Sequence, residues 1–381
     1  MIKIAYCIPG LYSPSGMERI LTNKVNYLAQ NGEYCIYIIT TEMNGREPFF
    51  KLHPSIKIID LDINFDQDLK KTFCQKAFSY IQKQHEYKCK LSQCLCNLKP
   101  DITISLLRRE IDFICNIPDG SKKIGEIHFN KSNYRELNIK YFPKKINVYL
   151  TKIWRKKLIN ELKKLSKFVV LTYEDQKEWN ELTNTIVIPN YIGNNEDLQT
   201  SCIQKNIISV GRYTYQKGFD LLIKAWEIVG NKYPEWKLNI YGNGNRNEYQ
   251  KLANECNVEK FINFNTTTKE IFEKYTQNSI FVLSSRFEGF PMVLIEAMSC
   301  GLPCVSFACP CGPKDIINDG IDGLLVPNGD IEALADKICY LIENEDVRIS
   351  MGQKAKENIK RFSEENVMSQ WQTLFDNLLS E

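Results

Sequence analysis

The sequence is short of histidine, of long apolar runs and of net charge, and each shortage excludes a class of protein. With three histidines and no paired C-x-x-C among fourteen cysteines, a zinc site is not expected. No run approaches the roughly 20 apolar residues of a membrane-spanning helix. The apolar run 2–8 is too short for a signal peptide. A net charge of +3 does not by itself suggest nucleic acid. We therefore expect a cytoplasmic protein with mostly buried free thiols, which binds no nucleic acid.

The composition that remains is that of a globular protein with two domains. Hydrophobic residues make up 43% and charged residues 25% of 381 residues, which is too long a chain for one ordinary core. Apolar runs alternate with helical patterns in both halves, so each half is predicted to form a doubly wound parallel sheet. The polar, irregular segment 189–204 predicts a linker between a first domain, 1–188, and a second domain, 205–363.

One stretch of the second half, 284–301, follows the apolar run 280–283, and the two together predict a strand, an acidic loop and a helix. Pro291 suits a helix start and Gly301 a helix end, so we expect a helix over about 291–299. Its first turn would offer the N–H groups of Phe290, Met292 and Val293 to a phosphate. Two carboxylates, Glu288 just before this helix and Glu296 one turn inside it, suit the hydroxyls of a sugar. The stretch therefore predicts a sugar-nucleotide site.

The residues of this stretch resemble a known family. Glu-Gly-Phe-Pro at 288–291, followed by Glu-Ala-Met-x-x-Gly-x-Pro at 296–303, is similar to the signature of retaining GT-B glycosyltransferases of family four. The resemblance implies two Rossmann-like domains facing across a cleft, with the last helix, 364–381, packing back across the domain boundary. It places Glu288 near the transferred sugar and Glu296 at the nucleotide ribose, and Gly289 joins the donor-binding set. The alternative is an ordinary amphipathic helix with one N-terminal and one exposed glutamate.

Two cations follow the first predicted strand of the second domain, 206–210. Arg212 offers a planar fork and Lys217 a point charge, which together could clamp a diphosphate. The resemblance assigns them that role, without a metal or other cofactor. A solvated basic loop is the alternative.

Four further residues are expected at the donor. The strand 2–8 is followed by a small-residue loop in which Gly16 lets the backbone approach a ligand closely, and the resemblance places donor phosphates there, although the family more often has two glycines where this chain has Ser15-Gly16. A lone glycine can equally permit a tight turn. Gly242 ends another predicted strand, and the backbone of Asn265 and Thr266 could meet the nucleotide base.

His128 follows the predicted strand 122–127, at a strand end where a side chain can face a ligand. The resemblance implies contact with the donor sugar or the acceptor, so His128 joins Glu288, Arg212 and Lys217 as expected catalytic residues. A structural role is the alternative. Glu126, two residues earlier, points to the same face of an extended strand and is a weaker candidate. The Asp-x-Asp patterns at 60–62 and 66–68 resemble metal sites of another glycosyltransferase fold, but short patterns of this kind arise by chance.

The segment 131–167 is strongly basic, with Glu136 and Glu161 as its only acids. The apolar residues Ile153, Trp154, Leu158, Leu162 and Leu165 are expected to form a helical stripe. A basic amphipathic helix can lie on an anionic membrane, whereas the stripe itself is better explained by packing in the core. The basic residues are Lys131, Arg135, Lys140, Lys144, Lys145, Lys152, Arg155, Lys156, Lys157, Lys163, Lys164 and Lys167.

Taken together, these patterns predict a retaining glycosyltransferase. The expected reaction moves a hexose or N-acetylhexosamine from a nucleotide diphosphate sugar, expected to be UDP-linked, to a hydroxyl of a glycan or lipid-linked acceptor. The product would belong to cell-surface polysaccharide or lipopolysaccharide synthesis. A sugar-nucleotide epimerase of the same fold and a non-catalytic sugar-nucleotide-binding protein are the alternatives. A dehydrogenase would need a third glycine at position 247, where the chain has Asn247.

Overall fold

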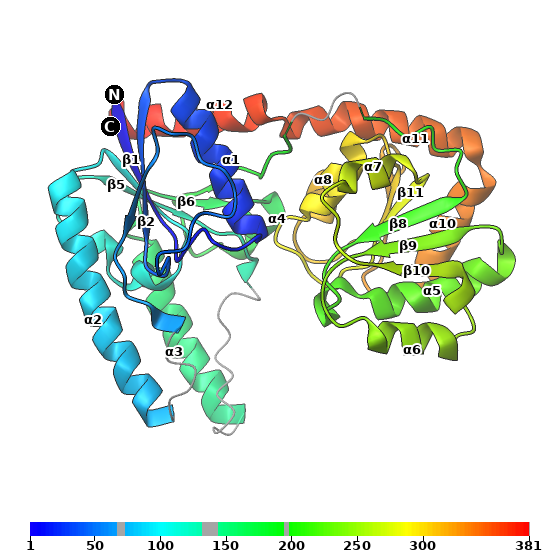
Figure 1. Cartoon of the computed structure of the whole chain (residues 1–381), viewed down its shortest axis with the longest axis horizontal. Helices are drawn as coiled ribbons and strands as arrows, with labels where there is room; N and C mark the ends of the chain where they lie inside the picture. Colours follow the sequence, from blue (N-terminus) through cyan, green and yellow to red (C-terminus); the bar gives the residue numbers. More distant parts are fainter. Residues whose placement is uncertain (67–72, 132–143, 194–197, 381) are drawn as a thin grey trace. The chain divides into compact units, whose positions relative to one another are not determined.

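The computed structural model describes residues 1–66, 73–131, 144–193 and 198–380 of the chain. These residues form two compact units. Unit 1 comprises Met1–Val170, Gln176–Ile188 and Met368–Glu381, and unit 2 comprises Leu171–Asp175 and Pro189–Val367. Each unit holds one parallel sheet with helices packed around it (Figure 1). The prediction of two doubly wound α/β sheets is therefore confirmed.

The sheet of unit 1 has seven parallel strands in the order β3-β2-β1-β4-β5-β6-β7. Because the order reverses between β1 and β4, ligands are expected at the carboxyl ends of these two strands. The strands are β1 (Ile2–Cys7), β2 (Tyr34–Thr40), β3 (Lys57–Asp60), β4 (Ile102–Ser105), β5 (Lys122–Glu126), β6 (Lys167–Val170) and β7 (Thr185–Val187). The helices of this unit are α1 (Gly16–Gln30), α2 (Phe73–Leu98), α3 (Lys144–Leu162), the second half of α4 (Tyr173–Glu178) and the last part of α12 (Glu364–Ser380).

The sheet of unit 2 has six parallel strands in the order β10-β9-β8-β11-β12-β13. Its order reverses between β8 and β11, so the second expected ligand position lies there. The strands are β8 (Asn206–Val210), β9 (Lys237–Tyr241), β10 (Ile262–Asn265), β11 (Ile280–Leu283), β12 (Cys304–Phe307) and β13 (Gly323–Val326), and the helices are α5 (Phe219–Lys232), α6 (Asn247–Glu255), α7 (Ile271–Thr276), α8 (Met292–Ser299), α9 (Pro313–Ile316), α10 (Ile331–Glu343) and α11 (Glu345–Asn358).

Each unit has its own apolar core between sheet and helices. In unit 1, Leu91 and Leu95 of α2 and Leu158 and Leu162 of α3 pack on strand residues such as Phe168. In unit 2, α5 and α10 cover one face of the sheet, while α8 contributes to a second cluster on the other. The central strands β4, β11 and β12 are buried along their whole length, as expected for strands covered on both faces.

The described helices include none with a stretch long and apolar enough to cross a bilayer. The cysteines that the structure describes are all free, and Cys89 alone among them is exposed.

Candidate active site

The loops after β8 and β11 touch at the point where the strand order of unit 2 reverses. Gly218, with φ of 62°, caps the start of α5, and a side chain there would place its Cβ 2.0 Å from the Ser284 carbonyl oxygen. The Ser284 hydroxyl in turn donates to the Lys217 carbonyl at 2.9 Å. Glycine at 218 is therefore required both by its backbone conformation and by this close approach.

Lys217 and Glu288 form an ion pair in this contact. Lys217 Nζ lies 2.7 Å from Glu288 Oε1, and the two side chains are only 13% and 6% exposed. The methylene groups of Lys217 lie close over Gly211, where an added Cβ would be 3.0 Å from the Lys217 Cδ. The structure thus joins two residues that the sequence predicted for the same site, and holds their charges with little access to water.

A second ion pair fixes the same two loops. The Arg286 guanidinium binds both carboxylate oxygens of Asp220, at 2.8 and 2.6 Å, and stacks 4.0 Å from the Tyr215 ring. Burial would raise the pKa of Asp220, but hydrogen bonds and charge from Arg286 outweigh it and lower that pKa. This pair was not predicted from the sequence, in which the only signal is that Arg286 stands two residues before Glu288.

Arg212 lies in the same loop but takes no part in these pairs. Its side chain is exposed and makes no ion pair with any residue that the structure describes. The prediction of a two-cation clamp therefore has one member held in place, Lys217, and one member, Arg212, whose guanidinium is available to a ligand.

The start of α8 offers backbone donors beside the ion pair. Pro291 was predicted to be the first residue of this helix, but it lies just before the helix, with ψ of 88°. Within the described part of the chain, the N–H groups of Met292 and Val293 find no acceptor, whereas Leu294 donates to the Pro291 carbonyl at 2.9 Å. Phe290 is buried, and the Glu288 N–H donates to the Pro310 carbonyl at 3.0 Å, which fixes the loop that ends at this helix.

Glu296 lies one turn inside α8 and is 4% exposed. The alternative of an ordinary helix with an exposed second glutamate is therefore wrong. A buried carboxyl group needs hydrogen-bond partners, and the hydroxyl of buried Tyr275 in α7 donates to Glu296 Oε2 at 3.2 Å. Tyr275 was not predicted, because nothing in the local sequence links α7 to α8.

Gly242 and Asn265 meet at the neighbouring strand ends. The Gly242 N–H donates to the Asn265 carbonyl at 3.2 Å, and a Cβ on Gly242 would lie 1.8 Å from the Gly211 carbonyl oxygen. Tyr213 packs between them with its hydroxyl 3.1 Å from the Asn265 carbonyl, and burial raises the Tyr213 pKa to about 12. Gly242 is thus required by packing alone, while Thr266 is exposed beyond it.

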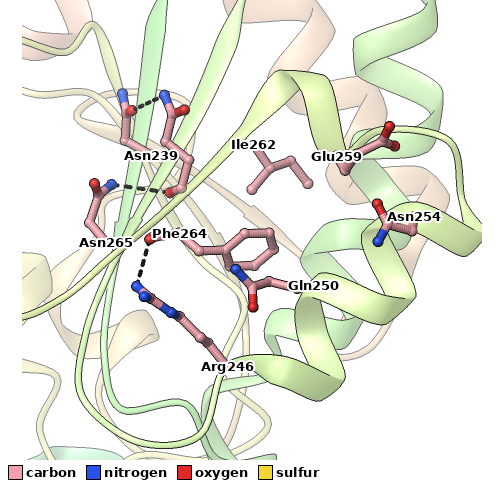
Figure 2. A pocket seen from close by; sticks show the side chains of 9 residues that line it. Asn239, Arg246, Gln250, Asn254, Glu259, Ile262, Phe264 and Asn265 are labelled. Atoms are coloured by element: carbon pink, nitrogen blue, oxygen red, sulfur yellow. Dashed lines mark hydrogen bonds between the residues drawn. The ribbon is translucent and has the colours of Figure 1, made fainter.

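A polar cavity of about 600 Å³ lies beside the edge strand β10, not at the strand reversal (Figure 2). Asn265 is the one predicted site residue that lines it, together with Asn239 and with Arg246 and Gln250 near the start of α6. Arg246 donates to the Phe264 carbonyl at 3.0 Å. The cavity therefore adjoins the predicted base-binding loop but shares none of its residues with the Lys217–Glu288 pair.

In unit 1, Gly16 is the first residue of α1. The helix is capped by Ser15, whose hydroxyl oxygen accepts from the Glu18 N–H at 3.4 Å. An added Cβ on Gly16 would meet no atom within 4 Å, and its φ is not in the left-handed range. The alternative that Gly16 serves a tight turn is therefore not supported, and the space beside its backbone is open.

His128 follows β5 and belongs to a buried charged network. Glu126 Oε1 lies 2.5 Å from Lys24 Nζ and 3.3 Å from His128 Nε2, with the Glu126 and Lys24 side chains 1% and 3% exposed. Lys24, in α1, also lies 3.8 Å from the centre of the Trp371 ring. Burial would raise the pKa of Glu126, but Lys24 and His128 outweigh it and lower it to about 2.

A second perturbed carboxyl group of unit 1 was not predicted. Glu42, just after β2, forms an ion pair with Arg109 at 2.8 Å, and the guanidinium stacks 4.2 Å from the Phe65 ring. Burial, followed by a hydrogen bond with Asp66, raises the Glu42 pKa to about 7 although Arg109 opposes the shift. Perturbed groups at strand ends are candidates for substrate contact.

The Asp-x-Asp patterns and the basic segment lie partly outside the described residues. Asp60 accepts hydrogen bonds from the Thr40 hydroxyl and the Asp62 N–H, and Asp68 lies outside the described residues, as do Arg135 and Lys140. No cluster of three potential metal ligands occurs among the residues that the structure describes.

The comparisons with known proteins point to one family. Residues 198–358 match the family model "Glycosyl transferases group 1". An uncharacterized glycosyltransferase of Haemophilus influenzae is 29% identical over 97% of this chain and 99% of that protein. The poly(ribitol-phosphate) α-N-acetylglucosaminyltransferase of Staphylococcus aureus is 27% identical over 79% of this chain and 62% of that protein.

Solved structures share the fold over the whole chain. Sucrose-phosphate synthase from Thermosynechococcus elongatus superimposes with a TM-score of 0.80 at 17% identity, covering 100% of both chains. TarM from Staphylococcus aureus superimposes with a TM-score of 0.76 at 19% identity, covering 99% of both.

Proposed function

Because this chain belongs to the group 1 glycosyltransferases, with the GT-B fold of two Rossmann-like domains, we propose that it transfers a hexose or N-acetylhexosamine from a UDP-linked donor with retention of configuration. The observation that supports this most is the shielded Lys217–Glu288 pair, whose Glu288 comes shortly before Met292 and Val293, the N–H groups of which donate to no described residue. A cation and the start of a helix can bind phosphate oxygens, and a carboxylate can accept hydrogen bonds from sugar hydroxyls. The three groups together therefore suit a sugar diphosphate.

The proposed chemistry depends on the negative charge that develops on the departing diphosphate. Lys217, the exposed Arg212 and the positive end of the α8 macrodipole would stabilise that charge, and preorganised donors of this kind are usually the largest single catalytic term. These groups require no metal ion. Glu288 would hold the sugar and Glu296 the ribose, while Gly242, Gly289, Asn265 and Thr266 complete the donor site of unit 2.

Unit 1 would contribute through His128 and the open backbone at Gly16. The 3.3 Å contact with Glu126 directs one ring nitrogen of His128 into the buried network. The other nitrogen is then left for the donor sugar or the acceptor hydroxyl.

The acceptor that we propose is a glycan or a lipid-linked glycan of the cell surface, met at the inner face of the cell membrane. Support comes from the names of relatives, which include the Staphylococcus aureus enzyme above and an amylovoran biosynthesis glycosyltransferase of Erwinia amylovora, 33% identical over 45% of this chain. UDP is the nucleotide named in the structure of Anabaena HepE, which has a TM-score of 0.72.

Incubation with radiolabelled UDP-, GDP- and ADP-sugars, with and without a membrane extract and with and without EDTA, tests this function. We expect label to enter a product from a UDP-sugar only when the extract is present, at a rate that EDTA does not change. Donor conversion without acceptor would indicate an epimerase, and binding without turnover a sugar-nucleotide-binding protein. NMR of the purified product would determine the anomer and hence whether configuration is retained.

A further inference from the structure

Helix α3 carries two apolar stripes on opposite sides. Leu158 and Leu162 are buried in the core of unit 1. Ile146, Tyr149 and Ile153 are 45%, 65% and 51% exposed, and their spacing of three and four residues places them on one face. Ile153, predicted for the core stripe, lies five residues before Leu158, which at 3.6 residues per turn turns it toward solvent. Single exposed apolar residues are ordinary, but a stripe of three indicates a surface that meets something.

Lysines flank the exposed stripe. Lys145, Lys152 and Lys156 follow one edge of it, and Lys157 lies on the other edge, where it is 3.3 Å from Asp112. The first three make no ion pair with any described residue. The helix contains no acidic residue before Glu161, near its C-terminal end. This set, Ile146, Tyr149 and Ile153 with Lys145, Lys152, Lys156 and Lys157, is named the outer face of α3.

We infer that the outer face of α3 lies on the surface of an anionic lipid bilayer. The two isoleucines and the tyrosine ring would enter the boundary between headgroups and acyl chains, while the lysines extend to lipid phosphates. Each lysine near such a surface adds attraction that falls with salt. The chemistry that fits this face is therefore an apolar layer under a sheet of negative charge.

The surrounding structure is consistent with such a contact. Figure 1 shows α2 and α3 extending beyond the sheet of unit 1 in the same direction. The corresponding half of α2 exposes Phe78 and Ile81, which are 65% and 67% accessible to solvent. Further apolar surface is thus available at the end of the unit from which α3 projects.

A second copy of the chain fits this face poorly. A symmetric dimer pairs one patch with itself, so the lysines of one copy would oppose those of the other. Like charges across an interface are repulsive, and among the described residues a carboxylate, Asp112, pairs with Lys157 but none pairs with the other three lysines. Charge complementarity therefore favours lipid over self-association.

Sedimentation of the full chain with vesicles tests this inference without any need for turnover, so it can fail while the proposed sugar transfer stands. We expect binding to vesicles of phosphatidylcholine with about 30% phosphatidylglycerol in about 0.1 M salt. We expect little binding to phosphatidylcholine alone, and release from the anionic vesicles at high salt. Tyr149→Ser with Ile153→Ser, and separately Lys152→Glu with Lys156→Glu, should each weaken binding about tenfold or more.

Matched controls lie in unit 2. Ile228→Ser with Tyr340→Ser removes two apolar side chains of comparable exposure, and Lys251→Glu with Lys269→Glu reverses two exposed lysines. We expect these controls to bind vesicles as the unaltered chain does, and all four variants to keep its melting temperature and its UDP binding.

Three outcomes would overturn the inference: no binding to anionic vesicles, equal binding to neutral ones, or binding that the α3 variants leave unchanged. Sedimentation velocity distinguishes the competing occupant. If the chain is a dimer that Tyr149→Ser with Ile153→Ser converts to a monomer, a second copy and not lipid covers the outer face.

Discussion

The carboxyl ends of the two sheets are built in different ways. In unit 2 the loops after β8 and β11 are joined directly by the Lys217–Glu288 and Arg286–Asp220 pairs and by the close approach at Gly218. In unit 1, His128 contacts the carboxylate of Glu126, which also forms an ion pair with Lys24 of α1. In unit 2 the paired residues Lys217 and Glu288 both belong to local motifs that the sequence analysis could use, whereas in unit 1 Lys24 belongs to no such motif.

The largest expected effect comes from separating the pair in unit 2. Lys217→Ala should lower kcat about 100-fold or more, because it removes a cation from the departing diphosphate and leaves Glu288 buried and unpaired. Arg212→Ala should lower kcat similarly with little loss of stability, since Arg212 is exposed. Steady-state kinetics and thermal melting measure the two effects.

The control for Lys217 is the double variant Lys217→Met with Glu288→Gln. It removes both charges and should regain most of the stability lost in Lys217→Ala without regaining activity. Near-normal turnover in folded Lys217→Ala protein would refute the role of this lysine.

In unit 1 the corresponding change is Lys24→Met. It should reduce the free energy of unfolding by about 3 kcal/mol, because Glu126 is left as an uncompensated buried charge. Adding Glu126→Gln should restore most of that loss. Urea unfolding measures both values. If the change in the free energy of unfolding of the double variant equals the sum of the two single changes, the two side chains are not coupled.

The pH dependence of stability should differ between two carboxyl groups of unit 1. The folded pKa of Glu126, about 2, lies below the ordinary value of 4.5, so its contribution is present above pH 4.5 and is lost as pH falls toward 2. The Glu42 pKa is raised to about 7, so the folded state binds the proton more tightly and stability falls as pH rises from 4.5 through 7.

Unfolding at a series of pH values measures these contributions. Glu126→Gln should flatten the curve below pH 4.5, and Glu42→Gln should flatten it between pH 4.5 and 7 and stabilise the protein above pH 7. A Glu42→Gln curve parallel to that of the unaltered chain would mean that the Glu42 pKa is not shifted.

The smallest chemical change is the addition of one methyl group to a glycine, which can be compared at one position in each unit. Gly242→Ala should destabilise unit 2 by about 3 kcal/mol, because the methyl group would overlap the Gly211 carbonyl oxygen. Gly16→Ala should leave stability within about 1 kcal/mol of the original or raise it slightly, since its φ and surroundings accept a side chain. A raised KM for the donor in Gly16→Ala, measured by steady-state kinetics, would support ligand contact there. An unchanged KM would remove Gly16 from the site.

Much of the fold and the unit 2 site could be predicted because their signals are local. Alternating apolar runs indicated both sheets, and the spacing of Glu288 and Glu296 indicated the strand, loop and helix that hold them. Arg286, Tyr275 and Tyr213 were missed because their partners lie far away in sequence, as with Arg286 and Asp220, 66 residues apart. Helix boundaries depend on cap conformation, which placed Pro291 outside α8.

The unit 1 network could not be predicted for the same reason. Glu126 was noticed only through its spacing from His128, while Lys24 and Trp371 have no sequence relation to either. Ile153 was assigned to the core stripe because apolar character alone does not show which side of a helix a residue occupies. That choice is made by the position of its neighbours in the fold.

The last residues of the chain, Met368–Glu381, group with unit 1, although the whole of unit 2 is translated before them. Until they emerge from the ribosome, Lys24 has no Trp371 ring over it and Tyr34 has no Phe375 beside it. The unit that is synthesised first is therefore the one completed last. A nascent chain that stalls after residue 367 would therefore carry the whole of unit 2 but a unit 1 that lacks its part of α12.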